Sequence, residues 1–358
     1  MRYPFAYLIC LLLAGIAVGG FYLGGIGHYA LPIVSFLIFP FFDYWRGQSH
    51  WPSEKRVAAM QPRTERGYDL TLFAGGATAV GLLFWALWAV SVTRLAWWEF
   101  AGAALTIGLT SGMTGIVVAH ELVHRNRRWA TRAAFFLMAL VCYAQYCIEH
   151  VYGHHVRVGT AEDPVTARKG QSLYGFALQS AAGSWAFAWP HEAERLRRRG
   201  KSVCSIANRI LVWIGFSLAV AAGSLLLLGP LSLLLFLLQS AIAILVFAGV
   251  DYIEHYGLTR ERLPDGRLER IGDQHSWNSS YLLTNIGLYN AGRHADHHLS
   301  PTKPYHRLLH RPEAPQLPFG YAAMIGLALV PPLWFRIMDR ELAKLRPPLA
   351  AASRAAPR

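Results

Sequence analysis

The sequence has 358 residues, of which 54% are apolar, 13% are aromatic and only 15% are charged. Soluble domains typically carry about a quarter charged residues, so this composition predicts an integral membrane protein and excludes a disordered chain, a collagen, a coiled coil and a disulfide scaffold. The net charge is +13. Because the basic residues stand beside apolar stretches, as in membrane proteins, we expect no nucleic-acid partner.

Six apolar stretches have the length and composition of transmembrane helices, in chain order 5–25, 31–42, 70–92, 100–119, 210–229 and 231–250. A bilayer core needs about 20 apolar residues per helix, and the second stretch is the shortest. Short, nearly uncharged connections join the stretches in pairs. We therefore expect an all-α integral membrane fold with about six transmembrane helices arranged as three hairpins, roughly 5–43, 70–119 and 210–250.

The segments between the hairpins are long and hold most of the charge, so all three hairpins open toward one side. The positive-inside rule makes that side cytoplasmic. We expect one membrane domain over residues 1–345, with cytoplasmic catalytic segments at 120–209 and 251–320, and a disordered tail at 346–358. The expected location is a bacterial inner membrane.

A further apolar stretch, 133–148, is too short to cross the bilayer. Its sixteen residues reach about 24 Å as a helix, less than the roughly 30 Å hydrocarbon core. We expect a re-entrant or interfacial helical pair that returns the chain to the cytoplasmic side. This arrangement would keep His124 and His150 on the same side of the membrane.

Nine of the fifteen histidines follow apolar segments, in the motifs His120-Glu-Leu-Val-His124, Glu149-His150-Val-Tyr-Gly-His154-His155, Asp251-Tyr-Ile-Glu-His255 and Arg293-His294-Ala-Asp-His297-His298. Helical residues three or four apart share a face. We therefore expect His120 with His124, His150 with His154, and His294 with His297 and His298 each to aim at one point. Neutral imidazole binds iron, zinc, copper or nickel. Nine imidazoles fit two ions with four or five nitrogens each, so we expect a cytoplasmic di-metal cap with non-haem iron, while copper stays open.

The first motif also satisfies the zinc-protease pattern H-E-x-x-H, with Glu121 as the general base. A protease would leave seven of the clustered histidines unused. Leu263-Pro-Asp-Gly266, which might offer a third ligand, is typical of a turn. A metal transporter is a further alternative, but it would need polar groups along the apolar stretches, which lack charged residues.

Together, HELVHR, IEHVYGHH, DYIEHYGL and GRHADHH resemble the integral-membrane alkane 1-monooxygenases (alkane omega-hydroxylases) of the histidine-rich membrane desaturase and hydroxylase superfamily. The resemblance covers roughly Tyr68 to Asp339. It implies that all nine histidines bind a di-iron centre, and that one oxygen atom of O2 enters the terminal C–H bond of medium- or long-chain alkanes to give 1-alkanols. A fatty-acyl desaturase, a terminal-olefin-forming enzyme and a xylene-type alkyl-aromatic hydroxylase are the alternatives.

Four carboxylates adjoin the histidines and are expected to hold the second nitrogens of the imidazoles: Glu121, Glu149, Glu254 and Asp296. The substrate is expected to reach the metals through an apolar channel between the stretches 31–42, 70–92, 100–119 and 210–250.

Electrons must come from outside, because the sequence has neither a dinucleotide loop nor a cysteine set for an iron–sulfur module. The resemblance implies a rubredoxin with an NAD(P)H-dependent rubredoxin reductase. An acidic rubredoxin could dock on a basic patch formed by Arg195, Arg197, Arg198, Arg199 and Lys201. The other interpretation is that this run lies on anionic membrane lipid.

Overall fold

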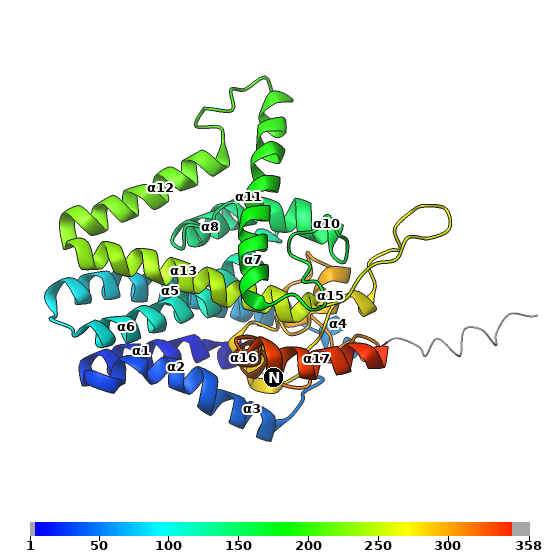
Figure 1. The fold of residues 1–358 in the computed structure, drawn as a ribbon, viewed down its shortest axis with the longest axis horizontal. Coiled ribbons are helices and arrows are strands. Elements are labelled where there is room, and N and C mark those ends of the chain that lie inside the picture. The colour runs from blue at the N-terminus through cyan, green and yellow to red at the C-terminus, as the bar shows by residue number, and fades with distance from the viewer. Residues whose placement is uncertain (1–3, 346–358) are drawn as a thin grey trace, which may run out of the picture.

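The computed structural model describes residues 4–345, a range that is helical and contains isolated bridges but no strand (Figure 1). Six helices in it are long and apolar enough to cross a membrane: Pro4–Leu23, Gly25–Arg46, Thr64–Val92, Trp97–Val123, Arg209–Leu228 and Pro230–His255. Short turns join them in three pairs, which confirms the predicted fold class. The predicted tail at 346–358 lies outside the described residues.

The long helices contain 3-10 or π-helical segments in addition to α-helical ones. The first hairpin consists of α1 (Ile9–Leu23), α2 (Ala30–Ile33) and α3 (Phe39–Arg46), with the short helices Pro4–Leu8, Gly25–Tyr29 and Val34–Ile38 between or before them. The second consists of α5 (Pro62–Val92), α6 (Trp97–Thr110), the π-helix Ser111–Ile116 and α7 (Val117–Val123). The third consists of α12 (Arg209–Gly223), the π-helix Ser224–Leu228 and α13 (Pro230–His255).

Glycine and proline set the sharp turn of the third hairpin. Gly229 has φ of +97°, a conformation that glycine adopts without steric cost. Pro230 follows at the first helical position of α13, where its missing N–H leaves no bond unmade. The chain therefore reverses within two residues.

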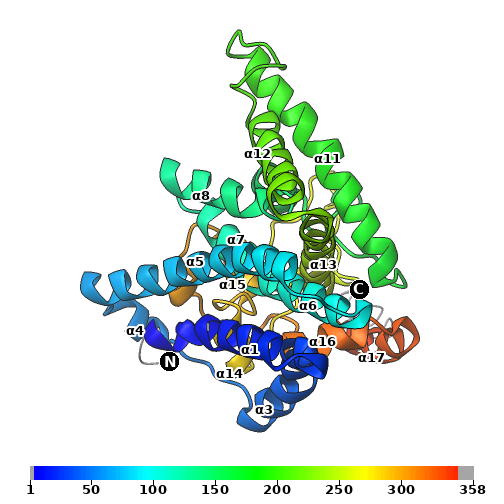
Figure 2. The same cartoon turned by 90° about the vertical axis from the view of Figure 1, so that its left-hand side faces the viewer.

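Helix α13 lies at the centre of the bundle, beside α5 and α6 (Figures 1 and 2). Small residues let α6 approach it closely, since a Cβ on Gly108 would lie 2.5 Å from Ile242. Polar side chains join the helices as well: the Ser232 hydroxyl donates to the Leu87 carbonyl at 2.7 Å, and the Gln239 amide donates to the Leu140 carbonyl at 2.9 Å. Such contacts associate helices where lipid gives no hydrophobic driving force.

The stretch 133–148 forms no single crossing helix, as the sequence predicted. Helix α8 (Arg128–Ala139) ends in a turn in which Cys142 has φ of +56°. Helix α9 (Tyr146–Glu149), the π-helix His150–His154 and α10 (His155–Arg157) follow. The reversal brings His150 back beside His124.

The other helices flank the bundle. They are α4 (Glu54–Ala58), α11 (Leu173–Arg197), α14 (Leu282–Gly287), α15 (His294–Leu299), α16 (Tyr321–Ala328) and α17 (Pro331–Leu345), with short 3-10 helices at Asp273–His275 and Tyr305–Arg307. Helix α11 and the start of α12 extend away from the remainder of the molecule (Figures 1 and 2). The turn predicted at Leu263-Pro-Asp-Gly266 is present, because the Gly266 N–H donates a hydrogen bond to the Leu263 carbonyl at 2.8 Å.

Candidate metal centre

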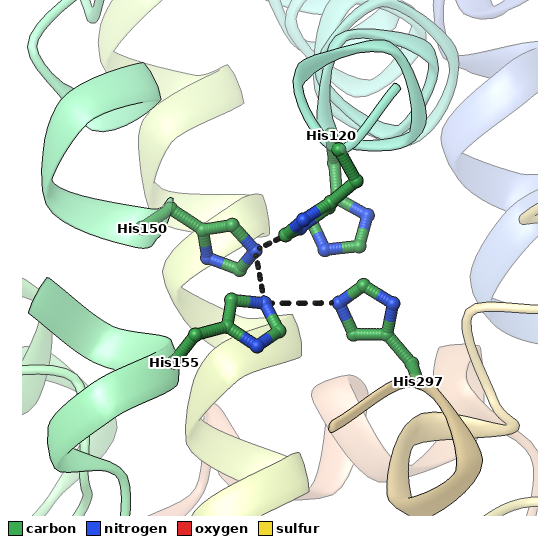
Figure 3. A group of neighbouring side chains, drawn as sticks. His120, His150, His155 and His297 are labelled. Atoms are coloured by element: carbon green, nitrogen blue, oxygen red, sulfur yellow. Dashed lines mark hydrogen bonds between the residues drawn. The ribbon is translucent and has the colours of Figure 1, made fainter. Parts of the chain in front are cut away.

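Five histidines converge from four segments, and we call them the five-histidine group: His120, His124, His150, His155 and His297. Their candidate ligand atoms lie within 4.8 Å of one another. The Nε2 atom of His150 lies 2.9 Å from that of His124 and 3.0 Å from that of His155 (Figure 3). The ring nitrogens therefore face a common point, as ligands of one ion must.

The other four predicted histidines form a second, fully buried group, the four-histidine group: His154, His255, His294 and His298. The Nε2 atom of His294 lies 3.0 Å from that of His255 and 2.9 Å from that of His298. The two groups are adjacent, because the rings of His155 and His298 have centroids 4.5 Å apart. All nine predicted ligands thus lie at one location, divided five and four.

The division of the second motif differs from the prediction. His150 and His154 belong to different groups, whereas His150 and His155 share one. Residues His150–His154 form a π-helix, whose i→i+5 bonding aligns residues five apart rather than four apart. In the last motif, His294 and His298 share a group as predicted, but His297 belongs to the five-histidine group.

Burial favours the neutral form of four of the candidate ligands. It lowers the pKa of His150, His155, His297 and His298 well below the usual value, and neighbouring imidazoles lower it further. Neutral imidazole is the form that binds metal. The buried Nε2 atom of His154 has no hydrogen-bond partner within the described residues. These donors therefore fit two metal ions.

Asp163 orients His154, and the sequence analysis assigned it no role. Its carboxylate accepts a hydrogen bond from the His154 Nδ1 at 2.9 Å and another from the Thr166 hydroxyl at 2.7 Å. Burial lowers the pKa of His154, but the Asp163 carboxylate outweighs that effect and raises it. The available signal was an acidic residue in Glu162-Asp163-Pro164, shortly after the second motif.

Among the four carboxylates expected to hold imidazoles, Glu254 lies against one. Its Oε1 is 3.2 Å from the His294 Nδ1 and accepts a hydrogen bond from the Tyr321 hydroxyl at 2.7 Å. The adjacent His255 instead directs its Nδ1 to the His275 backbone carbonyl, at 3.3 Å.

Two of the other three carboxylates, Glu121 and Asp296, pair with cationic side chains and not with imidazoles. Glu121 accepts from the Arg125 guanidinium at 3.2 Å, and Asp296 accepts from the Lys303 ammonium at 2.6 Å and pairs with Arg311. Because cationic side chains bind the oxygens of Glu121 and Asp296, these two carboxylates stabilise the surrounding segments and do not hold imidazoles. Neither oxygen of Glu149 has a hydrogen-bond partner in the described part of the chain.

The predicted basic patch is only partly exposed. Arg195 donates to Glu192 at 2.6 Å and to the Ala207 carbonyl at 2.8 Å, so it joins α11 to the loop before α12. The other members of the patch are exposed: Arg197, Arg198, Arg199 and Lys201. They lie at the far end of α11, the helix that extends away from the bundle (Figure 1).

An apolar cavity lies between the long helices. Its walls include Phe36, Met113 and Ile325. Val117 and Leu288 line both this cavity and a smaller one whose walls include three histidines: His120, His294 and His297. In contrast to the prediction, α16 contributes to the larger cavity, whereas the stretch 70–92 supplies none of the residues that line either one.

Six membrane-length helices around two convergent histidine groups define a multi-pass membrane protein with a candidate dimetal site. Comparison with known proteins specifies the class further. The family model for fatty acid desaturases matches residues 95–328. Alkane 1-monooxygenase 2 of Pseudomonas aeruginosa is 41% identical over 86% of this chain and 82% of its own length, and the alkane 1-monooxygenase of Ectopseudomonas oleovorans is 34% identical over 89% and 79%.

A more distant relative is the hydroxylase component XylM of the xylene/toluene monooxygenase of Pseudomonas putida, 29% identical over 89% of this chain and 88% of its own length. The chain belongs to the fatty acid desaturase family and, within it, to the alkane 1-monooxygenases. It is therefore an oxidoreductase of the monooxygenase type, as the sequence motifs indicated.

Proposed function

We propose that this protein inserts one oxygen atom of O2 into the terminal C–H bond of medium- or long-chain alkanes, giving 1-alkanols, at a di-iron centre held by the nine histidines. The observation that carries the proposal is that the apolar cavity and the smaller cavity lined by histidines share two wall residues, Val117 and Leu288. An alkane has no polar group, so shape and dryness must position it.

Each part of the protein has a separate task in this reaction. Two bound irons would supply the oxygen activation and electron transfer that amino-acid side chains do not provide. The histidines hold neutral nitrogens at fixed positions, and Asp163 and Glu254 fix the rings of His154 and His294. The apolar walls exclude water and orient the chain end of the alkane toward the histidines.

We also propose that rubredoxin, reduced by an NAD(P)H-dependent reductase, supplies the electrons. The absence of a cysteine motif or dinucleotide loop in the sequence supports an external donor. Excess positive charge on the segments between the hairpins supports both a cytoplasmic metal centre and a bacterial inner-membrane location. The exposed basic residues at the end of α11 remain a proposed contact for an acidic donor.

One alternative substrate has a specific observation behind it. The similarity to XylM favours an alkyl-aromatic hydroxylase with the same metal centre. Fatty-acyl desaturation and terminal-olefin formation would differ in product, since they leave a double bond in place of a hydroxyl group. Product analysis separates all of these reactions.

The test is mass spectrometry of products from the purified protein in nanodiscs with ferrous iron, octane to hexadecane, rubredoxin, its reductase, NADH and labelled O2. We expect a labelled 1-alkanol and about two irons per chain. His154→Ala and His297→Ala should abolish the product, whereas His50→Ala should retain it, because His50 is exposed and belongs to neither histidine group. Bound iron without alkane oxidation would reject the substrate, and zinc with no oxygen consumption would reject the di-iron centre.

A further inference from the structure

A third cavity, away from the histidines, opens between α8 and the beginning of α12 and has a volume of about 510 Å³. Three arginines line it: Arg128 and Arg132 from α8, and Arg209 from α12. Neither the cavity nor these arginines contribute to the candidate metal centre. The cavity therefore needs an explanation of its own.

Two of the three charges are uncompensated. Arg209 is paired with the Glu192 carboxylate at 2.6 Å. Arg128 and Arg132 are exposed and form no ion pair with any described residue. They lie four residues apart on one helix, where like charges repel. An anion bound between them would remove that repulsion, and guanidinium groups bind phosphate through paired hydrogen bonds.

The opposite wall of the cavity is apolar and continues along a membrane-length helix. Val212 and Trp213 line it, and the ring of Trp213 stacks with that of Phe135 from α8, with centroids 6.2 Å apart. Val212 and Trp213 belong to the helix Arg209–Leu228, and only 17% of the apolar stretch of this helix is buried inside the protein. Most of this helix is therefore available to lipid.

We propose that this cavity binds an anionic phospholipid, with the headgroup phosphate between Arg128 and Arg132 and an acyl chain along Val212 and Trp213. The negatively charged headgroup of a phospholipid matches the arginines of the cavity, and its acyl chain matches the apolar side chains beside them. Basic pockets beside transmembrane helices bind anionic headgroups by this combination. The site is independent of the oxygen chemistry.

Native mass spectrometry of the delipidated full-length protein in detergent tests the proposal, with phosphatidylglycerol and phosphatidylcholine as probes. We expect one tightly retained phosphatidylglycerol per chain and no comparable retention of phosphatidylcholine. The double variant Arg128→Gln/Arg132→Gln should bind phosphatidylglycerol roughly 30-fold more weakly, from about a fivefold contribution of each charge. Both side chains are exposed, so the thermal midpoint should not change.

The matched control is Arg336→Gln/Arg340→Gln, which removes two exposed arginines four residues apart on α17, outside the cavity. Equal weakening in this control would show that lipid retention follows net charge, and would overturn the proposal. Equal retention of the two lipids would overturn it as well. Displacement of phosphatidylglycerol by millimolar inorganic phosphate would overturn the proposal in favour of a site for free anions. Unchanged lipid binding in the double variant, together with loss of an acidic protein partner, would overturn it in favour of a protein-docking surface.

Discussion

Asp163 shows how one carboxylate can determine the orientation of a candidate ligand. Asp163→Asn keeps the size of the side chain but removes the charge beside His154, so the ring loses its fixed orientation. We expect metal affinity of the four-histidine group to fall by about 10- to 100-fold. Metal content per chain after a chelator challenge measures this effect.

The neighbouring Glu162→Gln is the control for this prediction, because the Glu162 side chain is 61% exposed and should leave the metal content unchanged. An equal loss of metal in both variants would contradict a specific role for Asp163. So would an Asp163→Asn protein that retains its metal as the unaltered protein does.

Residue types and their spacing predicted the nine histidines, since imidazole clusters beside apolar segments have few other uses. They could not predict which carboxylates face the imidazoles. Sequence adjacency suggested that Asp296 holds an imidazole, but its oxygens are bound by Lys303 and Arg311. Asp163 acts on His154 because the turn after α10 brings it back, and that path is tertiary information.

At the scale of elements, the close contact of α6 with α13 depends on the missing side chain of Gly108. Gly108→Val would overpack the contact with Ile242, and overpacking costs typically about 1–3 kcal/mol. We expect a lower thermal midpoint in detergent. Gly81→Val is the matched control, because a Cβ on Gly81 meets no atom within 4 Å; equal destabilisation by both substitutions would reject the packing argument.

The joint between α11 and α12 depends on Glu192, which is fully buried and binds both Arg195 and Arg209. Burial raises its pKa, but hydrogen bonds from the two arginines outweigh this and hold the pKa at about 2. The folded-state pKa is below the usual value of about 4.3. The stabilisation is therefore complete above that pH and is lost as the pH falls toward 2.

Glu192→Gln should reproduce the protonated state at neutral pH and loosen the loop at 198–208, because it leaves two arginines without their shared carboxylate. Faster tryptic cleavage after Arg199 and Lys201 measures the loosening. Glu194→Gln should leave the cleavage rate unchanged, because its partner Arg198 is 78% exposed and exposed pairs contribute little. Unchanged cleavage in Glu192→Gln would disprove the role of this joint.

Elements differ in how well a sequence predicts them. Hydropathy predicted the three hairpins, because a bilayer-length apolar run has few alternatives. The π-helix at His150–His154 was not predictable from 3.6-residue periodicity, and it places His150 and His154 in different histidine groups. A one-residue widening of a turn leaves no signal in composition.

At the scale of the whole molecule, our proposal predicts that the apolar cavity between the helices selects the substrate by its length. Ala322 lines this cavity, whereas the adjacent Ala323 does not. Ala322→Leu should shorten the space available to an alkyl chain and shift the preferred alkane to shorter lengths. Competition between octane and hexadecane, with the products quantified by mass spectrometry, measures the shift. An equal shift in Ala323→Leu would show that the cavity does not determine the preferred alkane length.

The order in which the ligands occur along the chain constrains how the protein matures. The five-histidine group is incomplete until His297 has been synthesised, and the four-histidine group until His298. By then all six membrane-length helices, the last of which ends at His255, have already been synthesised. Neither complete histidine group can therefore form before every membrane-length helix has been made, so a full metal complement has to be loaded after the transmembrane part of the chain exists.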